Sequence, residues 1–85
     1  MILLRKVSSA ESSVTAGTTY IRRIYWLNPT NLGDTVVLQN GADTEQITLR
    51  CEVASQSQFF DWNEGLLING SKLSTLASGT VYLYG

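Results

Sequence analysis

The 85-residue chain has no histidine, one cysteine (Cys51) and one proline (Pro29), and only 15% of its residues are charged. Because histidine is absent, a serine–histidine arrangement for nucleophilic catalysis cannot form, and a structural zinc site lacks a plausible ligand set. The single cysteine excludes a disulfide within the chain. Small domains without disulfides or metals often depend on self-association. We therefore expect no catalytic residues, no metal and no cofactor, and we expect the chain to bind copies of itself or a larger body.

The charge is nearly balanced, with six basic residues, seven acidic residues and a net charge of −1. Proteins that bind nucleic acid normally carry a basic excess, because neutralisation of phosphates drives their affinity. The longest apolar run is too short to span a bilayer, and "MILLRKVSS" is not followed by the apolar core of a secretory signal. We therefore expect no direct nucleic-acid partner and no membrane partner. We also expect production in a reducing cytoplasm, which suits an unpaired cysteine.

Serine and threonine make up about a fifth of the chain, and glycine and asparagine recur between short apolar stretches, which is typical of strands joined by turns. The clearest strand is "EQITLRCEV", where Ile47, Leu49, Cys51 and Val53 alternate with polar residues. This period of two predicts a half-buried antiparallel strand with Cys51 in the core. No stretch of ten residues has helical periodicity. The sequence therefore predicts an all-β fold, a compact antiparallel β-sandwich or jelly roll of seven to eight short strands.

Other segments complete this prediction of a single domain over residues 1–85. "MILLRKV" predicts a first strand, so that residues 1–8 form an arm or an edge strand, and "SSAESSVTAGT" predicts a polar loop with one short strand at Val14. "DTVVLQNGADTE" predicts a hairpin, because Asn-Gly tolerates the backbone of a tight turn. Asn69-Gly70 predicts a second turn, and "SGTVYLYG" predicts a last strand whose tyrosines oppose its apolar residues.

The stretch "TTYIRRIYWLNP" interleaves aromatic and basic side chains, so it can form a binding platform or an amphipathic strand. Strict alternation places Arg22 and Trp26 on one face, and Arg23 and Tyr25 on the other. Neither face is purely basic and aromatic, which disfavours a platform for nucleic acid. We predict a strand that buries residues 24–27 and leaves both arginines at a rim, where they can pair with acidic neighbours. Trp26 is either a core residue or a contact residue.

The stretch "QFFDW" puts Phe59 and Phe60 on opposite faces of a strand, so that Phe60 and Trp62 face outward if Phe59 belongs to the core. Asp61 and Glu64 are a conceivable acid–base pair, but carboxylates in such a turn-like stretch are ordinarily solvated. A small sandwich cannot bury both faces of several strands alone, so some aromatics should lie at a protein contact. The candidate interface residues are Ile2, Leu3, Leu4, Arg22, Arg23, Tyr25, Trp26, Phe60, Trp62, Tyr82 and Tyr84.

The C-terminal run "GLLINGSKLSTLASGTVYLYG", which follows "SQFFDW", is similar to the endings of small β-sandwich virion proteins of tailed bacteriophages. Together with "IYWLNPTN…DTVVLQNG…QITL", it resembles head-decoration, or cement, proteins, including those of cyanobacterial phages, over residues 20–85. The resemblance implies a homo-oligomer, with a trimer favoured, that binds the major capsid protein on the outside of the virion. There it would stabilise the shell across capsomer seams. The resemblance implies no catalytic residues.

Two alternative functions are compatible with the same fold. A carbohydrate-binding or host-attachment module would stack tryptophans on a sugar, beside asparagine, aspartate and arginine side chains. A structural subunit of a tail or a head–tail connector would differ only in its location. The two tryptophans, Trp26 and Trp62, do not share an obvious exposed face, which weighs against the sugar-binding module.

Overall fold

A computed structural model describes residues 1–85, and every regular element in it is a strand. The strands are β1 (Leu3–Val7), β2 (Glu11–Leu27), β3 (Thr35–Asn40), β4 (Glu45–Arg50), β5 (Gln58–Leu76) and β6 (Thr80–Tyr84). They form one antiparallel sheet in the order β1-β6-β2-β5-β3-β4. The predicted all-β antiparallel fold is confirmed, although six strands replace the predicted seven to eight short ones. The chain contains no helix that could cross a membrane.

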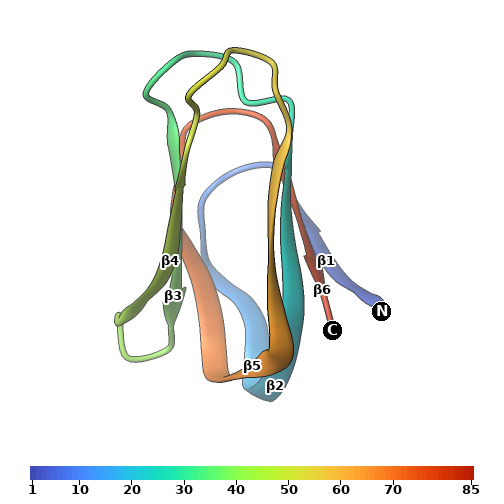
Figure 1. The fold of residues 1–85 in the computed structure, drawn as a ribbon. Helices are drawn as coiled ribbons and strands as arrows, with labels where there is room; N and C mark the ends of the chain where they lie inside the picture. Colours follow the sequence, from blue (N-terminus) through green and yellow to red (C-terminus); the bar gives the residue numbers. More distant parts are fainter.

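The long strands β2 and β5 bend together, so that the sheet folds over and its two ends face each other (Figure 1). The teal part of β2 and the yellow part of β5 lie beside β6 and β1, whereas the light-blue and orange parts lie on the side of β3 and β4. We name these parts the β6 half and the β3 half. Residues 23–27 of β2 pair with β6, and residues 71–76 of β5 pair with β3. The arrangement is sandwich-like, with β1 and β4 at the two ends of the strand order.

The two long strands differ from the predicted short ones because the bend is absorbed inside the ladder. β2 begins at Glu11, within the predicted polar loop, and the predicted turn at Asn69-Gly70 lies inside β5. Three register shifts occur along the β2–β5 pair, the last between Ile21 and Arg23. A bulge bends and twists a strand locally without ending its pairing. Polar and glycine-rich sequence therefore marks the bend of these strands rather than their ends.

The core lies between the two halves and draws its side chains from both. Trp26 is fully buried, and its indole Nε1–H donates a hydrogen bond to the Ser78 carbonyl at 2.7 Å, which satisfies the polar edge of the ring. Cys51 is buried, as predicted. The buried apolar residues are Val7, Val14, Ile21, Ile24, Trp26, Val36, Leu38, Cys51, Ile68, Leu73, Val81 and Leu83.

Two predictions of which side chains face the core are wrong. β4 ends at Arg50, so Val53 lies in the following loop with 56% of its surface exposed. The predicted alternation along β2 also fails, because Ile21, Ile24 and Trp26 are all fully buried. The register shift between Ile21 and Arg23 is the cause, because the pairing with β5 slips there by three residues, and an odd slip reverses the facing of the residues on one side of it.

The turn between β5 and β6 packs against Trp26 and has no room for a side chain at Gly79. Its φ is +74°, and an added Cβ would lie 2.5 Å from the Leu27 carbonyl oxygen and 2.9 Å from Trp26 Nε1. Gly17 has a similar φ of +67°, but an added Cβ there would meet no atom within 4 Å. A residue with a side chain would thus meet the same backbone strain at both positions, but only at position 79 would it also be crowded.

We predict that Gly79→Ala destabilises the protein more than Gly17→Ala. Gly17→Ala should cost about 1–2 kcal/mol, because alanine is strained in the left-handed region. Gly79→Ala should cost about 1–3 kcal/mol beyond that, because the methyl group overpacks the turn. Urea unfolding of both variants measures the loss in the free energy of unfolding. Equal losses would show that the turn accommodates the methyl group at no cost.

Candidate functional site

The two outer faces of the folded sheet differ in chemistry. On the β3 half, the outward residues of the central strands are Val37, Gln39, Lys72 and Thr75, and the surface is largely polar. On the β6 half, the row next to the buried Ile24 points outward and is mostly aromatic. This row contains one residue from each of four neighbouring strands, in the order Lys6, Tyr82, Tyr25 and Phe59.

Side chains in this outward row contact one another in pairs. Tyr25 and Tyr82 pack edge to face, with their ring centroids 6.2 Å apart and their planes at 86°. The Lys6 ammonium lies 5.9 Å from the centroid of the Tyr82 ring, and the Arg23 guanidinium lies 5.0 Å from that of Phe59. These distances are typical of cation–π contacts.

The next outward row of the β6 half continues this surface. It contains Tyr84, Arg23 and Asp61, because Arg23 pairs with both neighbours across the ladders, and Leu3 pairs with Tyr84 at the β1 edge of the row. Together the two rows form a continuous patch of aromatic rings. Two of these rings, Tyr82 and Phe59, each have a cation over one side of the ring. We call this surface the aromatic face, and its members are Lys6, Arg23, Tyr25, Phe59, Asp61, Tyr82 and Tyr84.

A bidentate ion pair joins two members of the aromatic face. Arg23 Nε donates to Asp61 Oδ1 at 2.5 Å, and Arg23 donates a second hydrogen bond to Asp61 Oδ2 at 2.8 Å. The hydrogen bond from Arg23 holds the pKa of the Asp61 carboxyl below its usual value, against the opposing effect of partial burial. The same bond raises the pKa of Arg23. Asp61 is therefore ionised at neutral pH and is not poised to act as a general acid.

A second exposed patch, this one mostly aliphatic, lies next to the aromatic face along the β2–β5 ladder, where the two strands begin to bend. Tyr20 and Leu67 are cross-strand partners that are 54% and 55% exposed. Ile2 exchanges two backbone hydrogen bonds with Gly85, whose Cα lies beside the Tyr20 carbonyl, so the patch reaches the start of β1. We call this surface the apolar end, and its members are Ile2, Leu3, Tyr20 and Leu67.

The structure separates the eleven candidate interface residues into groups. Arg23, Tyr25, Tyr82 and Tyr84 belong to the aromatic face, and Ile2 and Leu3 belong to the apolar end. Of the remaining candidates, Leu4 packs against the core, and Arg22 is exposed and forms no ion pair. Trp26 is a core residue and is not available for contact.

The prediction for "QFFDW" is reversed at Phe59. Phe59 is 60% exposed on the outer side, whereas Phe60 shares the row of the buried Ile24 and points toward the inner side at an open edge. There Phe60 packs edge to face on Trp62, with centroids 5.1 Å apart, and Trp62 packs against the core. The sequence could not reveal this arrangement, because alternation alone does not say which of two adjacent phenylalanines is inside.

The sequence reasoning also missed Lys6, Tyr20 and Leu67. Lys6 could have been found from its place next to Val7, since the neighbour of a core residue in a strand points outward. Strict alternation from Trp26 would put Tyr20 inside, because the register shift between Ile21 and Arg23 reverses its facing, whereas Leu67 shares the outward facing of Phe59. Only the paired structure places them together.

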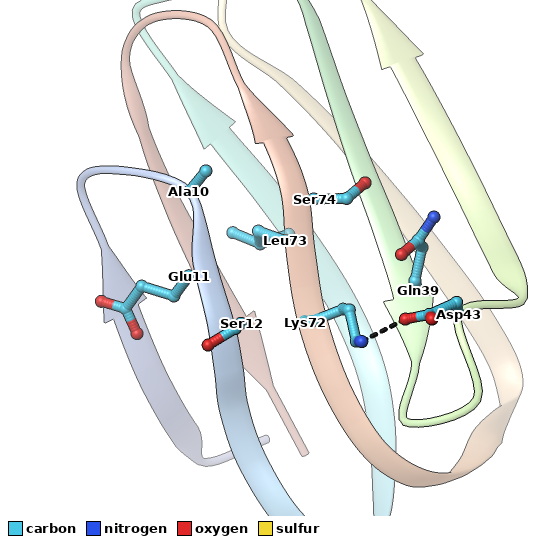
Figure 2. A pocket seen from close by; sticks show the side chains of 8 residues that line it. All are labelled: Ala10, Glu11, Ser12, Gln39, Asp43, Lys72, Leu73 and Ser74. Carbon is cyan, nitrogen blue, oxygen red and sulfur yellow. Dashed lines mark hydrogen bonds and ion pairs between the residues drawn. The ribbon is translucent and has the colours of Figure 1, made fainter.

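The largest depression lies on the opposite, polar face of the molecule (Figure 2). It has a volume of about 340 Å³, and its polar lining comes from β2, β3, β5 and the turn after β3. Lys72 forms an ion pair with Asp43 across it, and Glu11 at its rim is paired with Arg5 at 2.6 Å. Every charged side chain in the lining thus has a partner within the chain, which leaves no free charge to attract a ligand.

A smaller depression of about 180 Å³ borders the aromatic face. It brings together Arg22 and Trp62, two of the candidate residues, with Met1, Asp61 and Asn63.

The chain was compared with protein-family models, with curated proteins and with solved structures, and none of them matched.

We predict that the carboxyl of Asp61 titrates below the ordinary aspartate value of about 3.9 and that Arg23→Gln raises its pKa. The stabilisation from this pair should be present at neutral pH and lost only as pH falls through the lowered pKa, because the folded state binds the proton more weakly than the unfolded state. Carboxyl NMR titration measures the pKa of Asp61 in the wild type and in the variant. Arg22→Gln is the matched control and should leave the titration unchanged; an unshifted midpoint in the wild type would contradict the prediction.

Proposed function

We propose that the chain is a non-enzymatic structural protein that docks onto a protein assembly, and that this assembly is the capsid of a tailed phage. In this role it is a cement or decoration protein on the outside of the virion, bound to the major capsid protein across capsomer seams. The sequence resemblance supplies the identity of the assembly. The observation that carries the docking role is that the exposed apolar and aromatic residues of the strands gather on the β6 half and at the bend beside it, as the aromatic face and the apolar end.

The apolar end has the character of a surface that a partner covers. Its four residues are between 49% and 73% exposed, and they are neighbours through backbone pairing although they come from three separate segments. Contiguous exposed apolar patches on soluble proteins commonly mark interaction sites. Each square ångström of apolar surface that a partner covers contributes about 25 cal/mol to binding before the costs of association. We assign the apolar end to the contact with the capsid protein.

The carbohydrate-binding alternative has less support on this surface. Trp26 is buried, so the two tryptophans cannot form a shared stacking platform. Among the exposed rings, Tyr82 and Phe59 each carry a cation of the same chain on one face. Packed and partly covered rings suit a protein contact better than stacking on a sugar ring. A tail or connector subunit would use the same docking chemistry at another position in the virion.

We predict that the wild-type protein co-sediments with emptied shells of the phage that encodes it. The double variant Tyr20→Ser, Leu67→Ser should lose at least ten-fold in affinity, because it removes two exposed apolar side chains from the contact. The matched control is Leu32→Ser, Val53→Ser, which removes two residues that are 68% and 56% exposed outside the apolar end. The control should bind like the wild type.

Two outcomes would overturn parts of this proposal. Absence of wild-type binding to the shells would reject the cement role. Equal losses in both double variants would reject the apolar end as the contact surface. Binding to glycans of the host surface, measured on a glycan array, would favour the host-attachment alternative.

A further inference from the structure

We infer that the aromatic face is a self-association surface, on which a second copy of this chain docks about a two-fold axis parallel to the strands. This inference goes beyond the proposed function, because it concerns the chain alone and requires no capsid. The order of side chains across the four strands of the β6 half makes this surface self-complementary.

The aromatic face has its charges arranged asymmetrically across the sheet. Lys6 lies on β1 at one edge, and Asp61 lies on β5 at the other edge of this half. Between them, Tyr82 and Tyr84 lie on β6, and Tyr25 lies on β2. The free cation and the carboxylate are therefore separated by aromatic rings, which is the pattern of a self-complementary surface.

A two-fold axis parallel to the strands reverses the order of the strands between the copies. β1 of one copy then lies over β5 of the other, and β6 lies over β2. Residues of the same row face each other, so Lys6 lies opposite Phe59 of the second copy, and Tyr82 lies opposite Tyr25. Asp61 of the second copy is one outward row, or about 7 Å, from Phe59, within the length of a lysine side chain.

The same operation keeps like charges apart. Arg23 of one copy lies opposite Tyr84 of the other, and the two Lys6 side chains lie at opposite edges of the contact. Every cation of the face therefore meets an aromatic ring or a carboxylate, both of which attract it. A two-fold axis perpendicular to the strands would instead place β1 over β1, so that the two Lys6 side chains would lie at the same edge of the contact.

The size of the face indicates a weak and reversible dimer. Four strands about 4.8 Å apart are about 19 Å wide, and the five residues of β2 that pair with β6, at about 3.4 Å each, are about 17 Å long. The face then offers about 320 Å² per copy, or about 650 Å² in total, which is below the range of about 1,200–2,000 Å² for stable complexes. The dimer should therefore form at concentrations of tens to hundreds of micromolar, roughly as for weak transient pairs.

Sedimentation equilibrium of the isolated chain, from about 1 µM to about 1 mM, tests the inference. We expect a monomer–dimer equilibrium that weakens at least ten-fold in Lys6→Glu and in Phe59→Ser. The matched controls are Arg50→Glu, with the same charge change on β4, and Leu32→Ser, with the loss of an equally exposed apolar residue. Both controls should leave the equilibrium unchanged, and circular dichroism confirms that each variant is folded.

Cysteine cross-linking tests the orientation independently of affinity. Cys51 is buried, so an introduced thiol is the only accessible one. A mixture of Lys6→Cys and Phe59→Cys proteins should form the mixed disulfide dimer in preference to either homodimer.

Three results would overturn the inference. They are a monomer across the whole concentration range, an oligomer that Lys6→Glu and Phe59→Ser leave intact, and a mass other than that of a dimer, such as the trimer that the sequence resemblance implies. None of these experiments contains shells, so failure here leaves the proposed function standing, and failure of shell binding leaves the dimer standing.

Discussion

The bend of the β2–β5 pair is the constraint on which the rest of the structure depends. Both strands run through both halves of the sheet, so one continuous ladder joins the two layers that enclose the core. Had either strand ended at the bend, the two halves would have been separate four-stranded pieces, each with an uncovered apolar face. The bulges let the direction of the strands change while the pairing continues on both sides of the bend.

The bend also decides which surfaces of the protein are open to partners. Once the inner faces are buried against each other, every alternate residue of the β6 half must point outward. Lys6, Tyr25, Phe59 and Tyr82 come from four segments far apart in the chain, and the ladders of β1, β6, β2 and β5 place them in one row. Three of these four side chains are aromatic, so the outer surface of this half is largely apolar, whereas serine, threonine and glutamine make that of the β3 half polar.

Much of the strand content and one part of the candidate surface could be predicted from the sequence. The alternation of Val81 and Leu83 with two tyrosines predicted both the strand and its outward face, because no irregularity interrupts β6. The pairing of Arg23 with an acidic neighbour was also predicted and is confirmed. The sequence did not predict that this neighbour is Asp61. By contrast, the facing of Tyr20 and of Phe59 was not predictable, since each depends on which residue a neighbouring strand pairs with.

The sequence by itself determined that the chain forms antiparallel strands with a turn at "NGAD", because periodicity and turn chemistry are local properties. It also determined that Cys51 is a core residue and that aromatic residues exceed what so small a core can enclose. Only the tertiary structure decided that two polar, glycine-containing stretches bend strands instead of ending them. It alone decided that Trp26 is inside while Phe59 is outside. The physical reason is that bulges and strand pairing are non-local, so a single register shift reassigns side chains between the core and the surface.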